Sequence, residues 1–341
     1  MLASLVVPLA CLLAARAASP PFRADPRFEW IAAIEKHGGS HVLEARTYFI
    51  DRQYSLPSGT QIIGASSAAS SAITTIVAVP APKHNGGNYS GCGAAHINRI
   101  GFVLGNNTHI AKLHYVGFDT ARNRANHPLC GGAPFETPGC ASAYCEDSTD
   151  VGNGMGVHNA TVEDITVAKD GTQNVFWMPQ TRPGVPVSHD VTVRNIRSNG
   201  TWADGINVHG SHVNVRVEGC ELSNNGDDAY AIWSHGDEMS NITFQGNVAH
   251  KPRYPANTDG GYVSCYAVYG GRRMAFLDNV CTQTGPKGAI NFQVGYRGNF
   301  SSSSFADVHN NSVDGGKPIC GGPNIKAITA PGCHEAAPRW E

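Results

Sequence analysis

The stretch Val191-Thr-Val-Arg-Asn-Ile196 is matched 24 residues later by Val215-Arg-Val-Glu-Gly-Cys220, and apolar and polar residues alternate in both. Such alternation is typical of a short strand with one face toward an interior. Four further segments share the pattern: Val162-Glu-Asp-Ile165, Phe244-Gln-Gly-Asn247, Phe276-Leu-Asp-Asn279 and Val308-His-Asn-Asn311. The six segments follow one another at spacings of 31, 24, 27, 32 and 32 residues, so the chain from about residue 155 onward is a structural repeat.

A second strand pattern recurs once in each repeat, at Ile206–His209, Tyr230–Trp233, Tyr266–Tyr269 and Ala289–Phe292. Each strand is followed by Asn, Asp or Gly, which tolerate the tight or left-handed turns of a coil. The gaps leave no room for the dozen-residue helix that a doubly wound α/β fold needs. The sequence therefore predicts an all-β fold, a single-stranded right-handed parallel β-helix, in which stacked coils bury a continuous interior. Asn247, Asn279 and Asn311 are expected to form an asparagine ladder inside one turn.

The ends of the chain are less regular. Residues 1–17 form an apolar stretch ending in Ala15-Arg-Ala17, which predicts a cleaved secretory signal peptide and a secreted protein. Residues 18–341 are expected to form one β-helix domain. Phe28–His37 is interpreted as a helix that caps the open end of the coils, with strands following at His41–Ile50, Gln61–Ile63 and Thr75–Val79. The Gly-, Pro- and Cys-rich segment Asn123–Asn153 is interpreted as a long loop that either borders a site or is only a disulfide-tied surface loop.

Composition narrows the function classes. The net charge is −2 and only 15% of residues are charged, which argues against nucleic-acid binding and favours a neutral substrate. No segment after the signal approaches about 20 unbroken apolar residues, so no membrane span is expected. Nine cysteines follow the signal, an odd number that leaves at least one thiol unpaired. Disulfides are expected among Cys130, Cys140 and Cys145, and near Cys320 and Cys333, which bracket the C-terminal tail. Seven Asn-x-Ser/Thr sequons fit a glycoprotein.

Two aspartates fall at the same position of adjacent coils. Asp204 lies eleven residues after Val193, and Asp228 lies eleven residues after Val217. Stacked coils are about 4.8 Å apart, a separation at which two carboxylates repel each other. The Asn-Asn-Gly turn before Asp227 can rotate that residue onto the same outer face. Crowded carboxylates keep one group protonated while the others stay charged, which is what glycosidic-bond hydrolysis needs from an acid and a base.

Other readings of this cluster remain open. Aspartates near glycine often only cap turns, and a group of carboxylates can bind Ca²⁺. Because His209, His212 and His235 have no Cys or Glu at metal-ligand spacing, no metal site and no cofactor are expected. Aromatic and basic residues beside the aspartates are candidates for binding sugar: Trp202, His209, Tyr230, Trp233, Tyr269, Lys287 and Arg297. Strand alternation makes Tyr230 and Trp233 point in opposite directions, so at least one of these two belongs to the core.

Three runs carry a family resemblance: Trp202-Ala-Asp-Gly-Ile-Asn-Val-His209, Asn225-Gly-Asp-Asp-Ala-Tyr-Ala-Ile-Trp-Ser234 and Tyr266-Ala-Val-Tyr-Gly-Gly271. Over about residues 155–300 the chain resembles glycoside hydrolase family 87, the α-1,3-glucanase and mycodextranase group. More distantly it resembles the polygalacturonases and dextranases, which share the pectate-lyase-like β-helix. The resemblance implies that Asp227 is the proton donor and that Asp204 and Asp228 hold the attacking water. The Asn-Thr-Asp, Gly-His-Gly and Arg-Ile-Lys motifs of polygalacturonases are missing, which disfavours galacturonan.

The sequence thus predicts a secreted, monomeric, inverting glycoside hydrolase acting on a neutral α-glucan, such as α-1,3-glucan or nigeran. A first alternative is a polysaccharide lyase or epimerase, in which the aspartates bind Ca²⁺ and Lys287 or Arg297 is the base. A second alternative is a non-catalytic carbohydrate-binding β-helix.

Overall fold

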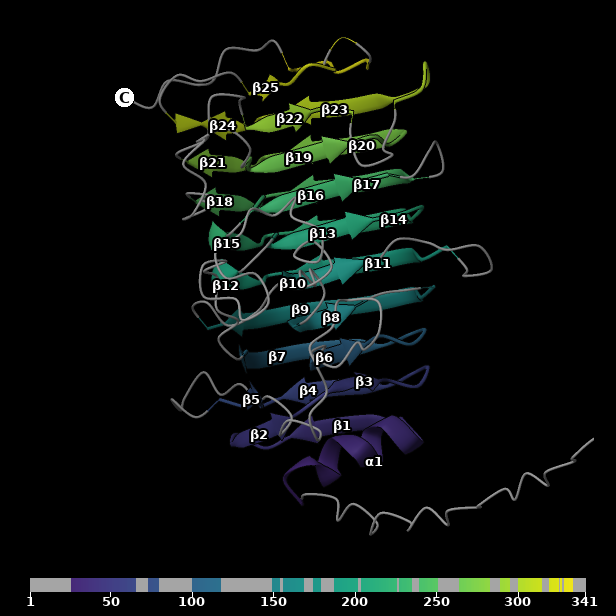
Figure 1. Ribbon diagram of the computed structural model, residues 1–341, viewed down its shortest axis with the longest axis vertical. Helices are drawn as coiled ribbons and strands as arrows, with labels where there is room; N and C mark the ends of the chain where they lie inside the picture. Colours follow the sequence, from purple (N-terminus) through teal and green to yellow (C-terminus); the bar gives the residue numbers. More distant parts are fainter. Residues whose placement is uncertain are drawn as a thin grey trace, which may run out of the picture.

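The chain is wound into a right-handed parallel β-helix whose coils stack along the long axis of the molecule (Figure 1). This computed structural model describes residues 26–65, 73–79, 100–117, 149–153, 156–168, 174–178, 187–201, 204–225, 227–234, 239–250, 264–282, 289–294, 300–314, 319–324, 326 and 328–333. The predicted signal peptide, most of the Asn123–Asn153 segment and the cysteines Cys130, Cys140 and Cys145 lie outside the described residues. No helix within the described ranges is long and apolar enough to cross a membrane.

The N-terminal end of the stack is closed by a short 3₁₀ turn, η1 (Pro26–Phe28), and the helix α1 (Glu29–His37), as the sequence predicts (Figure 1). One face of α1 is apolar, and Ile31 and Ile34 on that face are 0% and 2% exposed. The helix ends at His37, and Gly38 after it has a positive φ of 61° and donates its backbone amide to the carbonyl of Ile34. Helix α1 therefore covers the open end of the apolar interior.

The described strands form two parallel sheets. The sixteen-stranded sheet contains β1 (Ser40–Leu43), β2 (Thr47–Ile50), β4 (Gln61–Gly64), β5 (Thr75–Ala78), β7 (His109–Val116), β9 (His158–Val167), β11 (His189–Arg194), β12 (Arg197–Thr201), β14 (Val213–Glu218), β15 (Glu221–Asn225), β17 (Ser240–Gln245), β18 (Val248–His250), β20 (Arg273–Leu277), β21 (Val280–Thr282), β23 (Phe305–His309) and β24 (Ser312–Val313). The nine-stranded sheet contains β3 (Gln53–Ser55), β6 (Ile100–Val103), β8 (Thr149–Asn153), β10 (Asn174–Met178), β13 (Ile206–His209), β16 (Tyr230–Trp233), β19 (Tyr266–Tyr269), β22 (Ile290–Phe292) and β25 (Cys320–Gly321).

The predicted register is confirmed. Val193 of β11 pairs with Val162 of β9 and Val217 of β14, and the row continues through Phe244, Phe276 and Val308. All six side chains are 0–1% exposed, so each coil adds one apolar layer to a continuous core. The predicted strand His41–Ile50 is instead two strands, β1 and β2, because each pairs with a different strand of the next coil and the chain turns a corner between them.

The asparagine ladder is present as well. The side-chain carbonyl of Asn279 accepts from the backbone and side-chain amides of Asn247, at 3.0 and 3.2 Å. Asn311 repeats both bonds toward Asn279, at 3.1 and 2.9 Å. Each amide also donates to a backbone carbonyl one coil back, so these buried polar groups are satisfied. The ladder begins at the backbone amide of Cys220, which donates to Asn247 at 2.9 Å.

Cysteine pairing follows the sequence only in part. Cys320 and Cys333 form a disulfide, as expected, and Cys265 and Cys281 form a second one that was not predicted. The second disulfide joins the residue before β19 to β21, and so links the two sheets across the interior of one coil. Cys220 is the free cysteine of the described residues, and burial raises the pKa of its thiol to about 12.

Candidate active site

The three aspartates meet where the chain enters two neighbouring strands of the nine-stranded sheet. Strands β13 and β16 pair Ile206 with Tyr230, so Asp204 and Asp228 occupy equivalent positions one coil apart. One carboxyl oxygen from each of Asp204, Asp227 and Asp228 lies within 4.8 Å of the other two. The close stacking depends on Gly205, because a Cβ at this position would lie 2.6 Å from the carbonyl oxygen of Ala229. The structure thus assembles the predicted trio at the seam between two coils.

The three carboxyl groups differ in their surroundings. Asp204 and Asp228 are 4% and 2% exposed, whereas Asp227 is half-buried. The side-chain amide of Asn207 donates to one oxygen of Asp204 at 2.6 Å, and the backbone amide of Asp228 donates to the other at 3.1 Å. One oxygen of Asp228 accepts from the backbone amide of Ser264 at 2.5 Å. Donated hydrogen bonds favour the ionised form of a buried carboxylate. This arrangement leaves Asp227 as the most accessible carboxyl group of the three.

Three of the predicted substrate-binding residues lie in one row of the same sheet. The register places His209, Trp233 and Tyr269 opposite one another on β13, β16 and β19, five positions after the row of Asp204 and Asp228. The ring of Trp233 meets those of His209 and Tyr269 edge-on, with centroids 5.1 and 5.4 Å away. The amide of Gln293 donates to the hydroxyl of Tyr269 at 2.5 Å. His209 and Trp233 are half-buried and Tyr269 is 8% exposed. The row is a connected aromatic strip along the coils.

Tyr230 is a correction to the predicted set. Its side chain is 0% exposed, and its ring stacks on that of Tyr266 in the core with centroids 4.9 Å apart. Its hydroxyl lies within hydrogen-bond distance of two carbonyl oxygens, that of Cys220 at 3.0 Å and that of Val248 at 3.1 Å. Burial raises the pKa of Tyr230 well above the ordinary value. Tyr230 is therefore a core residue and not a sugar ligand. The expectation that at least one of Tyr230 and Trp233 points inward is confirmed.

The remaining candidates are only partly placed. Trp202, Lys287, Arg297 and His235 lie outside the described residues. His212 is 0% exposed, and its Nε2 lies 2.8 Å from the carbonyl oxygen of His209, which is a structural role. Among the described residues, the aspartate trio is the one group of acidic, histidine or cysteine side chains spaced to hold a metal ion.

Sequence reasoning missed two residues that bind the trio. Asn207 is 2% exposed and donates to Asp204, and Ser264 is 1% exposed and donates to Asp228 through its backbone. Asn207 stands only three residues after Asp204, on the face of β13 opposite to the core residues Ile206 and Val208, and this signal was available in the sequence. The role of Ser264 was not, because it lies 36 residues after Asp228 and is brought to it by the pairing of β16 with β19.

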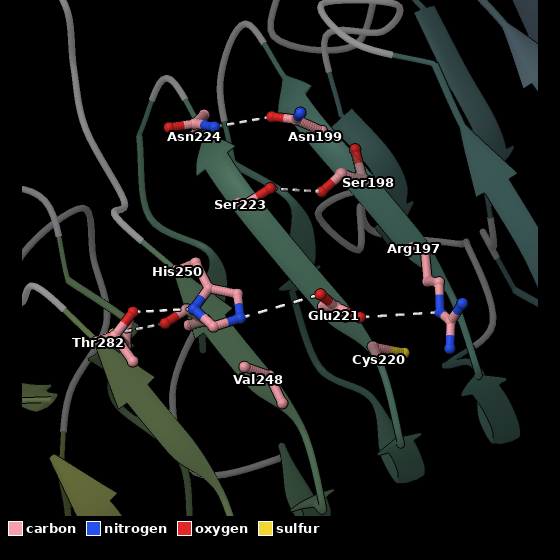
Figure 2. Close-up of polar contacts among 12 residues, drawn as sticks. Arg197, Ser198, Asn199, Cys220, Glu221, Ser223, Asn224, Val248, His250 and Thr282 are labelled. Carbon is pink, nitrogen blue, oxygen red and sulfur yellow. Dashed lines mark hydrogen bonds and ion pairs between the residues drawn. The ribbon is translucent and has the colours of Figure 1, made fainter. Parts of the chain in front are cut away.

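A second polar cluster lies on the outer face of β12, β15, β18 and β21 (Figure 2). Glu221 forms an ion pair with Arg197 at 3.7 Å, and its carboxylate lies 3.9 Å from Nε2 of His250. The other ring nitrogen of His250 lies 2.9 Å from the hydroxyl of Thr282. The side chains of Arg197 and Glu221 are 75% and 51% exposed. Exposed cross-strand pairs of this kind stabilise a solvated sheet face by at most about 1 kcal/mol. The cluster is a surface network on a different sheet from the aspartates.

No protein-family model matches the chain, and no curated protein sequence does. Among solved structures, the chain is similar to the catalytic domain of a glycoside hydrolase family 87 α-1,3-glucanase in complex with nigerose, with a TM-score of 0.53 and 19% identity over 82% of this chain and 42% of that one. An aspartate-to-alanine variant with nigerose gives a TM-score of 0.54 at 18% identity, over 84% and 44% of the two chains. A second such variant with tetrasaccharides gives 0.53 at 18% identity, over 80% and 40%.

The chain spans about two-fifths of the length of those glucanase chains. Three of the structures each carry one aspartate-to-alanine substitution, and the substituted positions are 23 residues and then one residue apart. Asp204, Asp227 and Asp228 have the same spacing. At this level of identity the likeness concerns the fold: the chain has the parallel β-helix architecture of the family 87 α-1,3-glucanase catalytic domains.

Proposed function

We propose that the protein is a glycoside hydrolase that cleaves a neutral α-glucan, such as α-1,3-glucan or nigeran, with Asp204, Asp227 and Asp228. The observation that carries the proposal is the meeting of three carboxyl oxygens within 4.8 Å across one coil seam. Asp204 and Asp228 are buried and accept hydrogen bonds, whereas Asp227 is half-buried. This difference supports the first two as the bases and Asp227 as the acid. The shared 23-plus-one spacing of aspartates in the glucanase structures supports the same assignment.

The proposed reaction uses the three groups as follows. Protonated Asp227 donates its proton to the glycosidic oxygen while the bond from that oxygen to the anomeric carbon breaks. Ionised Asp204 and Asp228 hold a water molecule, whose oxygen bonds to the anomeric carbon and whose proton passes to one of these carboxylates. The leaving sugar departs with a new hydroxyl group, so atoms and charges balance. The hydrogen bonds from Asn207 and Ser264 keep the two bases charged and fixed.

The aromatic row supplies the proposed sugar contacts. Rings of His209, Trp233 and Tyr269 suit the C–H faces of pyranose rings, and the row runs along the coils beside the aspartates. The low charge of the chain fits a substrate without carboxylates. The glucanases of similar fold bind nigerose and tetrasaccharides, which supports an α-glucan as the first substrate to test.

The proposal includes inversion of configuration, and this point has a direct measurement. The three oxygens lie closer than the roughly 6.5–9.5 Å that usually separates the two carboxyl groups of inverting enzymes. Three carboxylates offer a different geometry, with two bases holding the water together. Proton NMR of the first product detects which anomer forms. We expect the β-anomer from an α-glucan; the α-anomer would instead assign an aspartate as a nucleophile.

The first experiment is Asp227→Asn. We expect the release of reducing ends from α-1,3-glucan, nigeran or dextran to fall at least about 10²-fold, as is usual when a general acid is removed. The matched control is Asp278→Asn, an exposed aspartate in a turn after β20 with a left-handed backbone that asparagine tolerates. Circular dichroism should show the same β-sheet signal in both variants. Full activity in Asp227→Asn would refute the assigned role.

A Ca²⁺-dependent lyase or epimerase is the second candidate, because the same three oxygens are spaced to hold a cation. A lyase leaves an unsaturated sugar that absorbs in the ultraviolet, and a chelator abolishes the activity. A hydrolase produces reducing ends and is insensitive to the chelator. Retention of polysaccharide in a pull-down without any product would indicate a binding module instead. The two disulfides of the described residues favour an extracellular site of action, which we include in the proposal.

A further inference from the structure

A chain of five buried polar residues passes through four neighbouring coils of the nine-stranded sheet. Its members are all at most 4% exposed: Asn207, Asp204, Asp228, Ser264 and Asn291. Asn207 donates to Asp204 at 2.6 Å, the backbone of Asp228 donates to Asp204 at 3.1 Å, and the backbone of Ser264 donates to Asp228 at 2.5 Å. The amide of Asn291 closes the chain by donating to the hydroxyl of Ser264 at 3.3 Å. Two of the proposed catalytic groups therefore sit inside a buried network.

Asn207 is the one side chain in this network that donates directly to a carboxylate. An ionised carboxylate only accepts, so the nitrogen of the Asn207 amide must face Asp204. The other end of the amide, its carbonyl oxygen, is buried and has no hydrogen-bond partner among the described residues. A buried acceptor without a partner destabilises the fold. Stability of the fold alone therefore does not explain an asparagine at position 207, whereas its hydrogen bond to Asp204 does.

We propose that Asn207 is a positioning residue that holds Asp204 ionised and oriented as a base. The catalytic part of this inference rests on the proposed hydrolase function, whereas the effect on the Asp204 carboxylate does not. Removing the amide takes one hydrogen-bond donor away from a 4% exposed carboxylate, which disfavours the charged form. Asp204 would then bind its proton at higher pH, and its side chain would lose the contact that fixes it to Asn207.

Asn291 provides a matched control. It occupies the same register position as Asn207 three coils further along, through the row Asn207, Ala231, Ala267 and Asn291. It is 0% exposed and also has a carbonyl oxygen without a partner, but its amide donates to a hydroxyl and not to a carboxylate. Substitution of either asparagine removes a similar buried amide, yet only one of them touches Asp204.

The test is a carbon-13 NMR titration of the Asp204 carboxyl group in the wild type, Asn207→Leu and Asn291→Leu, with the signal assigned by its loss in Asp204→Asn. We expect the titration midpoint of Asp204 to rise by about one pH unit in Asn207→Leu, the effect of losing a hydrogen bond to the charged form. It should stay unchanged in Asn291→Leu. Asn207→Ala is the second variant if the leucine variant does not fold. An unchanged midpoint, or an equal rise in both variants, would overturn the inference.

Kinetics then separate this inference from the proposed function. With a glucan that the wild type hydrolyses, the acid limb of the plot of kcat against pH should shift to higher pH in Asn207→Leu. At one pH unit below the midpoint of the wild-type limb, kcat should be about tenfold lower than in the wild type, with KM unchanged. If the wild type hydrolyses no polysaccharide but the midpoint moves, the hydrolase proposal fails and the positioning of Asp204 stands. If hydrolysis occurs but neither midpoint nor acid limb moves, the hydrolase proposal stands and the role of Asn207 is rejected.

Discussion

Asn279 shows how much one polar residue contributes to a β-helix. Its side chain accepts two hydrogen bonds from Asn247 and donates to Asn311 and to the carbonyl of Phe244. We expect Asn279→Ala to lower the free energy of unfolding by about 3 kcal/mol, because several buried groups lose their partner together. Urea unfolding followed by fluorescence measures the change. Asn310→Gly, which alters an exposed asparagine in the equivalent turn one coil further along, should lower it by less than about 1 kcal/mol. Equal losses would show that the buried ladder has no special weight.

Glu163 gives the stability a pH dependence. Burial raises its pKa, but hydrogen bonds from Arg194 and His109 and their charges outweigh burial and leave the pKa below the ordinary value of 4.5. A carboxyl group with a lower pKa in the folded state stabilises the protein above its unfolded pKa. That stability is lost as the pH falls through the folded value.

We therefore expect the free energy of unfolding to fall as the pH drops below about 4.5, and to fall less steeply in Glu163→Gln. Urea unfolding between about pH 3 and pH 7 measures both slopes. Glu221→Gln is the control, since Glu221 is a half-exposed partner of the surface network in Figure 2. A Glu163→Gln curve parallel to that of the wild type would contradict the assignment.

For single residues, the sequence predicted those positions that the spacing of the repeats determines. Asp204 and Asp228 were placed together because each lies eleven residues after a core valine, and a fixed register carries that equality into space. The direction of Tyr230 was not settled, because alternation separates it from Trp233 without saying which of the two faces inward. The stacking of Tyr230 on Tyr266 decides this, and such packing between coils has no local signal.

Among the elements, the starts of β9, β11, β14 and β17 share one corner geometry. The second residue of each strand has a left-handed backbone, with φ of 54–57° at Asn159, Asp190, Asn214 and Asn241. Amides of this row donate to the residue one coil back, as Asn214 does to Asp190 at 3.0 Å and Asn241 does to Asn214 at 2.9 Å. Asparagine and aspartate tolerate this conformation better than other side chains do, which explains their recurrence at one register position.

This row also predicts where N-linked glycans attach. Asn159 and Asn241 are exposed and begin Asn-x-Thr sequons, whereas Asn214 lacks one only because Arg216 stands where a threonine is needed. Expressed through a eukaryotic secretory pathway, Arg216→Thr should gain one glycan at Asn214, and Thr243→Val should lose the glycan at Asn241. Peptide mass spectrometry before and after amidase release of glycans measures both. An unmodified Asn241 peptide in the wild type would reject the prediction.

The strands were predictable to different degrees. From β9 onward, the apolar positions recur often enough to predict one row of strands in each sheet. The sequence did not predict β10 or the short strands β12, β15, β18, β21, β24 and β25. Before β9, β3 and β6 are short and their spacing is uneven, so only their pairing in the nine-stranded sheet identifies them. The disulfide between Cys265 and Cys281 was missed for a related reason. Cys265 and Cys281 are 16 residues apart in sequence. They meet because the chain passes within one coil from β19 in one sheet to β21 in the other.

For the whole molecule, the open end of the coil stack is the vulnerable surface. Helix α1 covers it with Ile31 and Ile34, and an uncovered parallel end would offer both apolar side chains and free strand edges to another molecule. We expect Ile31→Asp to lower the melting temperature and to produce oligomers in size-exclusion chromatography with light scattering. Ala33→Asp on the exposed face of the same helix should do neither. A monomeric, fully stable Ile31→Asp protein would show that α1 is dispensable.

The placement of the aspartates at a coil seam has one more consequence. Twenty-two residues separate Asp204 from Asp227 along the chain, but their relative position is set by the backbone bonds of Gly205 and Ile206 to the next coil. A slip of β16 by a single residue would turn every side chain of the strand to the opposite face. Because the register changes only by whole residues, a shift of β16 should separate the three aspartates completely, whereas an unchanged register keeps them together.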